Sequence, residues 1–146
     1  MEDSYQLTPS TELLSNERIA QSFQADRSAY IRDHAWMAAA AMAAGMLILW
    51  AIGNPHIWTG GVGGLAAIAI RGFYVASDEM NVRWDLTNLR LLGPQTRVVS
   101  LSDIENVRIL ASAVQVISKT GDKHLLKYQA DRNSTKAAIL AAAANA

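Results

Sequence analysis

The chain has 146 residues, with thirteen basic and thirteen acidic side chains, so its formal net charge is zero. It has no cysteine, which excludes disulfides, thiolate metal ligands and cysteine nucleophiles. Residues 71–146 carry ten basic and seven acidic side chains, and this small excess of positive charge is far too weak to indicate a nucleic-acid partner.

The N-terminal part of the chain is polar. Residues 1–16 are rich in Ser, Thr and Gln and are expected to form a disordered tail. Residues 17–34 lead into a long apolar run and are interpreted as a juxtamembrane segment. The apolar residues of its first part fit either one face of a helix or alternate positions of a strand, and periodicity leaves this choice open. Asp26 or Ser28 is suited to cap the helix that follows.

The central feature of the sequence is an apolar run. From Ala35 to Ile70, 36 consecutive positions carry no Asp, Glu, Lys or Arg. Gly53-Asn54-Pro55 interrupts the run, because glycine suits a helix end and proline cannot continue a helix. We therefore predict a transmembrane hairpin over residues 35–76, with helices at about 35–52 and 57–76. The first helix would span roughly 27 Å, close to the thickness of a bilayer core. A buried helical hairpin of a soluble protein is the alternative.

The residues that flank the apolar run predict its orientation. Trp36, Trp50 and Trp58 lie at helix ends, where amphipathic rings favour the membrane interface. The turn between the helices has no basic residue, whereas the six arginines nearest to the outer ends of the run would all lie on the opposite side of the membrane from this turn. The positive-inside tendency therefore places both termini in the cytoplasm. These arginines are Arg18, Arg27, Arg32, Arg71, Arg83 and Arg90.

Small residues recur in both apolar helices at a spacing of four. Such residues let helix backbones approach closely in lipid, so we expect the two helices to pack on each other through them. An oligomer face built from Gly60-Gly61 and Gly63-Gly64 is the alternative. The candidate packing residues are Ala40, Ala44, Gly45, Gly60 and Gly64.

The chain after the hairpin has the pattern of a small domain over residues 80–146. Short segments of alternating apolar and polar residues are separated by turn signals, which predicts a small antiparallel sheet or partly open barrel. Residues 131–145 are alanine-rich and follow a candidate cap, so the chain is expected to close with a helix. The predicted fold class is therefore an α+β membrane protein.

Two stretches of this domain carry a resemblance to a known family. The stretch Trp84-Asp85-Leu86-Thr87-Asn88-Leu89-Arg90-Leu91 resembles the opening hairpin of bacterial membrane-flanked pleckstrin-homology-like (PH-like) domains, and residues 99–107 are similar to the next element of that family. Upstream, Glu17-Arg18-Ile19 and Ser28-Ala29-Tyr30 look like the lead into the membrane of the same proteins. The resemblance implies a PH-like domain at the bacterial inner membrane.

The sequence shows no arrangement of reactive residues. His34, His56 and His124 lie in separate segments without a second ligand at metal-binding spacing. Ser100, Asp103 and His124 lack the context of a nucleophile elbow. The glycines at 60–64 follow no strand, so they do not form a dinucleotide loop. We expect a non-enzymatic protein without cofactor or metal.

The expected function is that of a scaffold or assembly factor for a membrane complex. The bilayer and either other membrane proteins or a second copy of the chain are the expected partners. The alternative is a module that senses lipid headgroups, since basic residues near a membrane surface attract anionic lipids. The candidate interaction surface comprises Arg90, Arg97, Lys119, Lys123 and Lys127.

Overall fold

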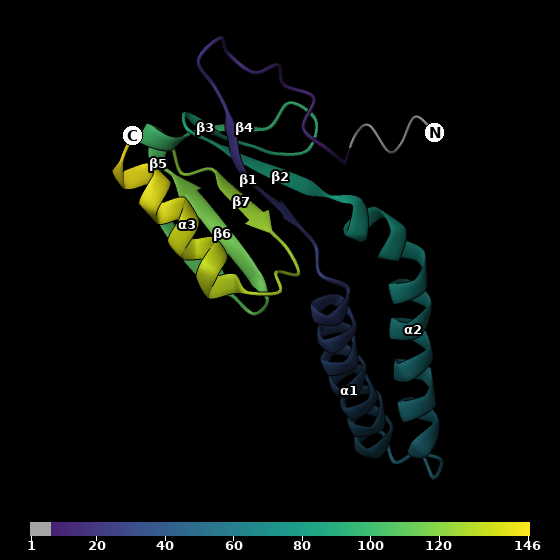
Figure 1. Ribbon diagram of the computed structural model, residues 1–146. Helices are drawn as coiled ribbons and strands as arrows, with labels where there is room; N and C mark the ends of the chain where they lie inside the picture. Colours follow the sequence, from purple (N-terminus) through teal and green to yellow (C-terminus); the bar gives the residue numbers. More distant parts are fainter. Residues whose placement is uncertain (1–6) are drawn as a thin grey trace. The chain divides into compact units, whose positions relative to one another are not determined.

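The computed structural model describes residues 7–146 and divides into two compact units (Figure 1). One unit combines residues 7–29 with residues 78–146, and the other consists of residues 30–77. Over these residues the chain is α+β, with two long apolar helices, two small antiparallel sheets and a C-terminal helix.

The apolar run forms two helices, α1 (Arg27–Ala51) and α2 (Trp58–Asn81). Both are long and apolar enough to cross a membrane, by length and composition, and only 6% of the most apolar stretch of each is buried. Helix α1 begins eight residues before the expected start at 35, because the Asp26 carboxylate accepts a hydrogen bond from Ala29 N (2.9 Å) and caps the polar first turns. Helix α2 continues five residues past 76. The turn between them needs Gly53, whose φ is +74°.

Four strands form the first sheet, in the order β1-β2-β3-β4, with antiparallel neighbours. The strand β1 resolves the open choice in residues 17–24, because it pairs with β2 along its length. Helix periodicity and strand alternation fit these residues equally well, and the partner strand decides between them. The strands are β1 (Ile19–Gln24), β2 (Arg83–Thr87), β3 (Arg90–Leu92) and β4 (Val98–Ser100).

The second sheet has three antiparallel strands in the order β5-β6-β7. A short 3-10 helix (Leu101–Asp103) connects it to the first sheet. Two separate sheets are therefore found in place of the one small sheet or partly open barrel expected from the sequence, and the 3-10 helix, whose Leu101 is buried, lies between them in the chain. The strands are β5 (Ile104–Leu110), β6 (Ala113–Ser118) and β7 (Lys123–Leu126).

Side chains from both sheets and from helix α3 (Arg132–Ala144) make one hydrophobic core. Helix α3 packs on β5 and β6 (Figure 1). Its side chain Ile139 is fully buried, and the alanines around it permit a close approach. Asp131 caps the helix by accepting a hydrogen bond from Ser134 N (3.0 Å). Gly93 is needed beside the core, since a Cβ there would overlap the ring of Trp84.

The N-terminal segment belongs to the same unit as the strands that follow the hairpin. A domain bounded at 80–146 lacks β1, which supplies Phe23 to the core. Residues 7–16, expected to belong to a disordered tail, hydrogen-bond to the loop after β3: Ser10 N donates to Gln95 O (2.9 Å) and Gln95 N donates to Thr8 O (3.1 Å). The remainder of that expected tail, residues 1–6, lies outside the described residues.

Candidate functional site

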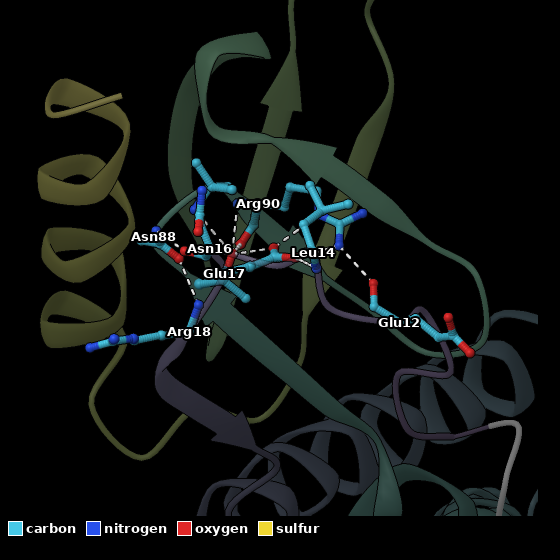
Figure 2. A network of polar contacts seen from close by, with 9 residues as sticks. Glu12, Leu14, Asn16, Glu17, Arg18, Asn88 and Arg90 are labelled. Atoms are coloured by element: carbon cyan, nitrogen blue, oxygen red, sulfur yellow. Dashed lines mark hydrogen bonds and ion pairs between the residues drawn. The ribbon is translucent and has the colours of Figure 1, made fainter.

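A buried ion pair joins Glu17 of the N-terminal segment to Arg90, the first residue of β3 (Figure 2). The Glu17 carboxylate accepts hydrogen bonds from Arg90 Nη2 (2.5 Å) and Arg90 Nε (2.9 Å), which is a two-point guanidinium–carboxylate contact. The Thr87 hydroxyl donates to the same carboxylate (2.6 Å), and so does Leu14 N (2.9 Å). The Glu17 side chain has no exposed surface. Both charged groups are therefore engaged in contacts within the folded protein.

The pair has a clear electrostatic consequence. The hydrogen bond from Arg90, opposed by burial and assisted by Thr87, lowers the pKa of Glu17 from 4.5 to about 2. The same hydrogen bond raises the pKa of Arg90. Glu17 therefore stays ionised over the physiological pH range and is unsuited to exchange protons in a reaction.

The turn residue Asn88 extends this network to the neighbouring backbone. Its Oδ1 accepts from Arg18 N (2.8 Å), and its Nδ2 donates to Asn16 O (3.1 Å). Asn88 N also donates to Arg18 O (3.2 Å). The Thr-Asn-x-Arg part of the family-like stretch and the upstream Glu-Arg-Ile are thus partners of one another in the fold.

A second buried carboxylate fastens β1 to β2. Asp85 lies opposite Ser22 in the register and accepts a hydrogen bond from its hydroxyl (2.7 Å). The Arg83 guanidinium lies 3.1 Å from the same carboxylate. A buried charge needs such partners, because its desolvation without them costs on the order of several kcal/mol. Asp85 is therefore a structural residue.

The five predicted surface cations differ in exposure and in partners. Arg90 is 17% exposed and held by Glu17, so it is not available to an external anion, which corrects the expectation for this residue. Lys119 and Lys123 are exposed and flank the turn between β6 and β7. Arg97 and Lys127 line a cavity, and Lys127 lies 3.4 Å from Glu79. The sequence pattern alone does not reveal these differences in partners.

The predicted packing glycines lie at the contact between α1 and α2. A Cβ at Gly45 would overlap the carbonyl of Gly60, and a Cβ at Gly64 would overlap the carbonyl of Ala41. The alanines at 40 and 44 are exposed instead, because they lie on another side of α1. Of the glycines offered as an oligomer face, only Gly63 has open space around it.

Polar residues at the open end of the two helices form a clasp. Tyr30 donates a hydrogen bond from its hydroxyl to Gly72 O (2.6 Å), and its ring stacks on His34 (4.0 Å between centroids). Arg71 Nη1 lies 3.3 Å from His34 Nε2. A guanidinium has only donors, so Nε2 is the acceptor and Nδ1 donates to Tyr30 O (3.0 Å). Sequence spacing gave no sign of this arrangement.

A cavity of about 280 Å³ lies in the unit formed by residues 7–29 and 78–146. Its apolar wall includes Phe23 and Trp84, both almost fully buried, and the half-exposed Leu125. The Trp84 indole N–H is buried and has no hydrogen-bond acceptor among residues 7–146. The charged residues of the lining are Asp78, Glu79, Arg97 and Lys127.

His124 lies beside this cavity wall rather than in a ligand cluster. Its ring meets the edge of Trp84 at 5.9 Å between centroids. Burial lowers the pKa of His124, and the nearby charge of Arg97 lowers it further, against a smaller effect of Asp122. Among residues 7–146, no three His, Asp or Glu side chains gather as a metal site would require.

Comparison of the chain with protein families, curated proteins and solved structures found no match.

Proposed function

We propose that the protein is a non-enzymatic scaffold or assembly factor, in which α1 and α2 cross the bacterial inner membrane and hold a PH-like domain at its cytoplasmic surface. The exposed apolar side chains of both helices support insertion, because a soluble core helix buries most of its surface. Examples at 58–71% exposure are Ile48, Trp50, Ile52, Trp58 and Ile70.

The observation that carries the proposal is the place of the hairpin in the chain. It is inserted between β1 and β2, which are paired neighbours of one sheet. Only Ala25 and Asp26 separate β1 from α1, and only Val82 separates α2 from β2. Two such short links restrict the domain far more than one flexible tail would. Restriction to the bilayer surface raises the effective concentration of the domain for membrane-bound partners.

The PH-like assignment has two kinds of support. The first is the succession of two antiparallel sheets and a closing helix. The second is the contact of Glu17 with Arg90 and Thr87, which gives a physical reason for the residues of the family-like stretch. Such domains serve many purposes, so the fold alone does not define the partner.

The scaffold role is tested by purifying the tagged full-length protein in a mild maltoside detergent after brief crosslinking in cells. A membrane-protein partner or a discrete homo-oligomer is expected in stoichiometric amount. Recovery of a monomer alone, with and without crosslinking, would overturn the role.

Orientation is tested with reporters that are active on one side of the membrane only. Cytoplasmic reporters are expected to work at both termini, because the opposite orientation would translocate Arg27, Arg32, Arg71 and Arg83. A tag at Gly53-Asn54 is expected to be the externally accessible site. An external signal from the C-terminus would contradict this orientation, and release of the protein in soluble form would contradict insertion.

A further inference from the structure

The cavity beside Trp84 combines charge of both signs with an apolar wall. Its four charged residues comprise two acids and two bases, so its net charge is zero. Glu79 and Lys127 lie 3.4 Å apart and partly neutralise each other. Arg97 and Asp78 are exposed and have no side-chain ion pair or hydrogen bond with another described residue. One guanidinium and one carboxylate are therefore free to meet a ligand.

This pattern discriminates between classes of ligand. A multiply charged anion would gain from Arg97 but would be repelled by Asp78 and Glu79. A simple cation would gain from Asp78 and Glu79 but would be repelled by Arg97 and Lys127. A molecule that carries both an anionic and a cationic group satisfies the two free side chains together. Arginine is suited to the anionic end when this is a phosphate, because its planar fork donates two parallel hydrogen bonds.

The size and the apolar wall limit the ligand further. The cavity of about 280 Å³ lies just below the roughly 300–1,000 Å³ of sites for drug-sized ligands. It therefore suits a headgroup rather than a whole lipid. Leu125, 38% exposed, offers apolar surface next to the charges, where the glycerol carbons of a phosphate ester can pack.

We infer that this cavity binds a zwitterionic phosphate ester with an ammonium group, the phosphate on Arg97 and the ammonium on Asp78. An aminophospholipid headgroup and its soluble glycerophosphoethanolamine form share this chemistry. The lipid source rests on the proposed function: in a membrane-spanning α2, Asp78 lies two residues past Ala76, the end of the expected apolar span, and would be near the headgroups.

The binding test uses the full-length protein in a maltoside detergent, which lacks the phosphate and amine of zwitterionic detergents. Replacing Trp36, Trp50 and Trp58 by Phe leaves Trp84 as the sole indole, inside the cavity wall. Glycerophosphoethanolamine is expected to shift the Trp84 fluorescence and indole N–H resonance in a saturable manner. Arg97→Gln and Asp78→Asn are each expected to weaken binding at least about tenfold, as loss of one charge-assisted hydrogen bond does.

Matched controls are Arg108→Gln and Asp103→Asn, which change exposed charges that do not line the cavity. Both are expected to bind as the parent does. Absence of a saturable shift would overturn the inference, and so would equal binding by the cavity variants and the controls. Equal binding of inorganic phosphate would overturn the role of Asp78, because a bare anion has no ammonium group.

Nanodiscs distinguish the two sources of the ligand. If the lipid is bound, the Trp84 signal changes between phosphatidylethanolamine-containing and phosphatidylglycerol-only discs, and Asp78→Asn abolishes the difference. If only the soluble ester binds, the discs give equal signals and the lipid source is excluded. A protein that binds the ester but is not membrane-inserted would refute the proposed function and leave the cavity chemistry standing.

Discussion

At the scale of single residues, the contact between Glu17 and Arg90 determines how the N-terminal segment is held. The two residues are 73 positions apart, yet the carboxylate has no exposed surface and takes four hydrogen bonds from Arg90, Thr87 and Leu14. Removal of one member of such a pair leaves the other buried charge uncompensated, which costs more than the net value of the pair. The contact therefore stabilises the attachment of the N-terminal segment, which includes β1, to the first sheet.

The pH dependence of the stabilisation by this ion pair follows from the pKa of Glu17. The folded value is about 2 and the ordinary value is 4.5, so the folded state binds this proton more weakly than the unfolded state does. The stabilisation is complete above pH about 4.5 and is lost as the pH falls through about 2, and it amounts to about 3 kcal/mol. Glu17→Gln, which resembles the protonated acid, is expected to lower the free energy of unfolding by this amount at pH 6.

The measurement compares the unfolding of the parent and of Glu17→Gln in maltoside between pH 6 and pH 2. The difference is expected to shrink toward zero as the acid limit is approached. Glu105→Gln, which changes an exposed carboxylate on β5, is the matched control and should have little effect at any pH. A difference between parent and Glu17→Gln that stays constant over this range would contradict the ion-pair account.

At the scale of elements, the two apolar helices touch through backbone rather than through large side chains. Gly45 approaches Gly60, and Gly64 approaches Ala41, so closely that a Cβ at any of these glycines would overlap a carbonyl of the opposite helix. In lipid there is no hydrophobic drive between helices, and close backbone packing is a main source of their association. The small-residue spacing in the sequence indicates this type of contact, but it does not select the face.

The helix contact gives a prediction with a control on the same helix. Gly60→Val is expected to destabilise the hairpin by about 2 kcal/mol or more, because the added carbons would force the backbones apart. Gly63→Val carries the same change in helix propensity, but Gly63 has open space around it and should cost far less. Thermal unfolding in maltoside, followed by helical circular dichroism, provides the comparison. Equal losses for the two variants would show that the glycine contact does not hold the hairpin.

At the scale of the whole molecule, the chain leaves one sheet for the hairpin and returns to the same sheet. The apolar run, the turn signals and the terminal cap could be read locally, because each depends on neighbouring residues. The membership of β1 in the later domain could not be predicted locally, because Ile19–Gln24 fits both the helix and the strand periodicity. Its partner strand β2 lies beyond the hairpin in the sequence. The cavity and the Glu17 network could not be predicted from the sequence for the same reason. Their residues come together from distant segments of the chain, and no spacing pattern marks them.

This topology predicts how the domain can be separated from the hairpin. Residues 80–146 alone lack Glu17 and also lack β1, which supplies Phe23 to the core and pairs with the edge of β2, so they are expected to be unfolded or aggregated. A shortened chain that joins Gln24 to Arg83 through a two-residue Asn-Gly turn should instead fold in solution, because these residues are already opposite each other in an antiparallel pair.

Dispersed amide resonances and a cooperative unfolding transition of the shortened chain are the measurements that check its folding. Introducing Glu17→Gln into the shortened chain should lower its stability as it does in the full protein. If the shortened chain fails to fold while residues 80–146 fold alone, β1 is not part of the domain.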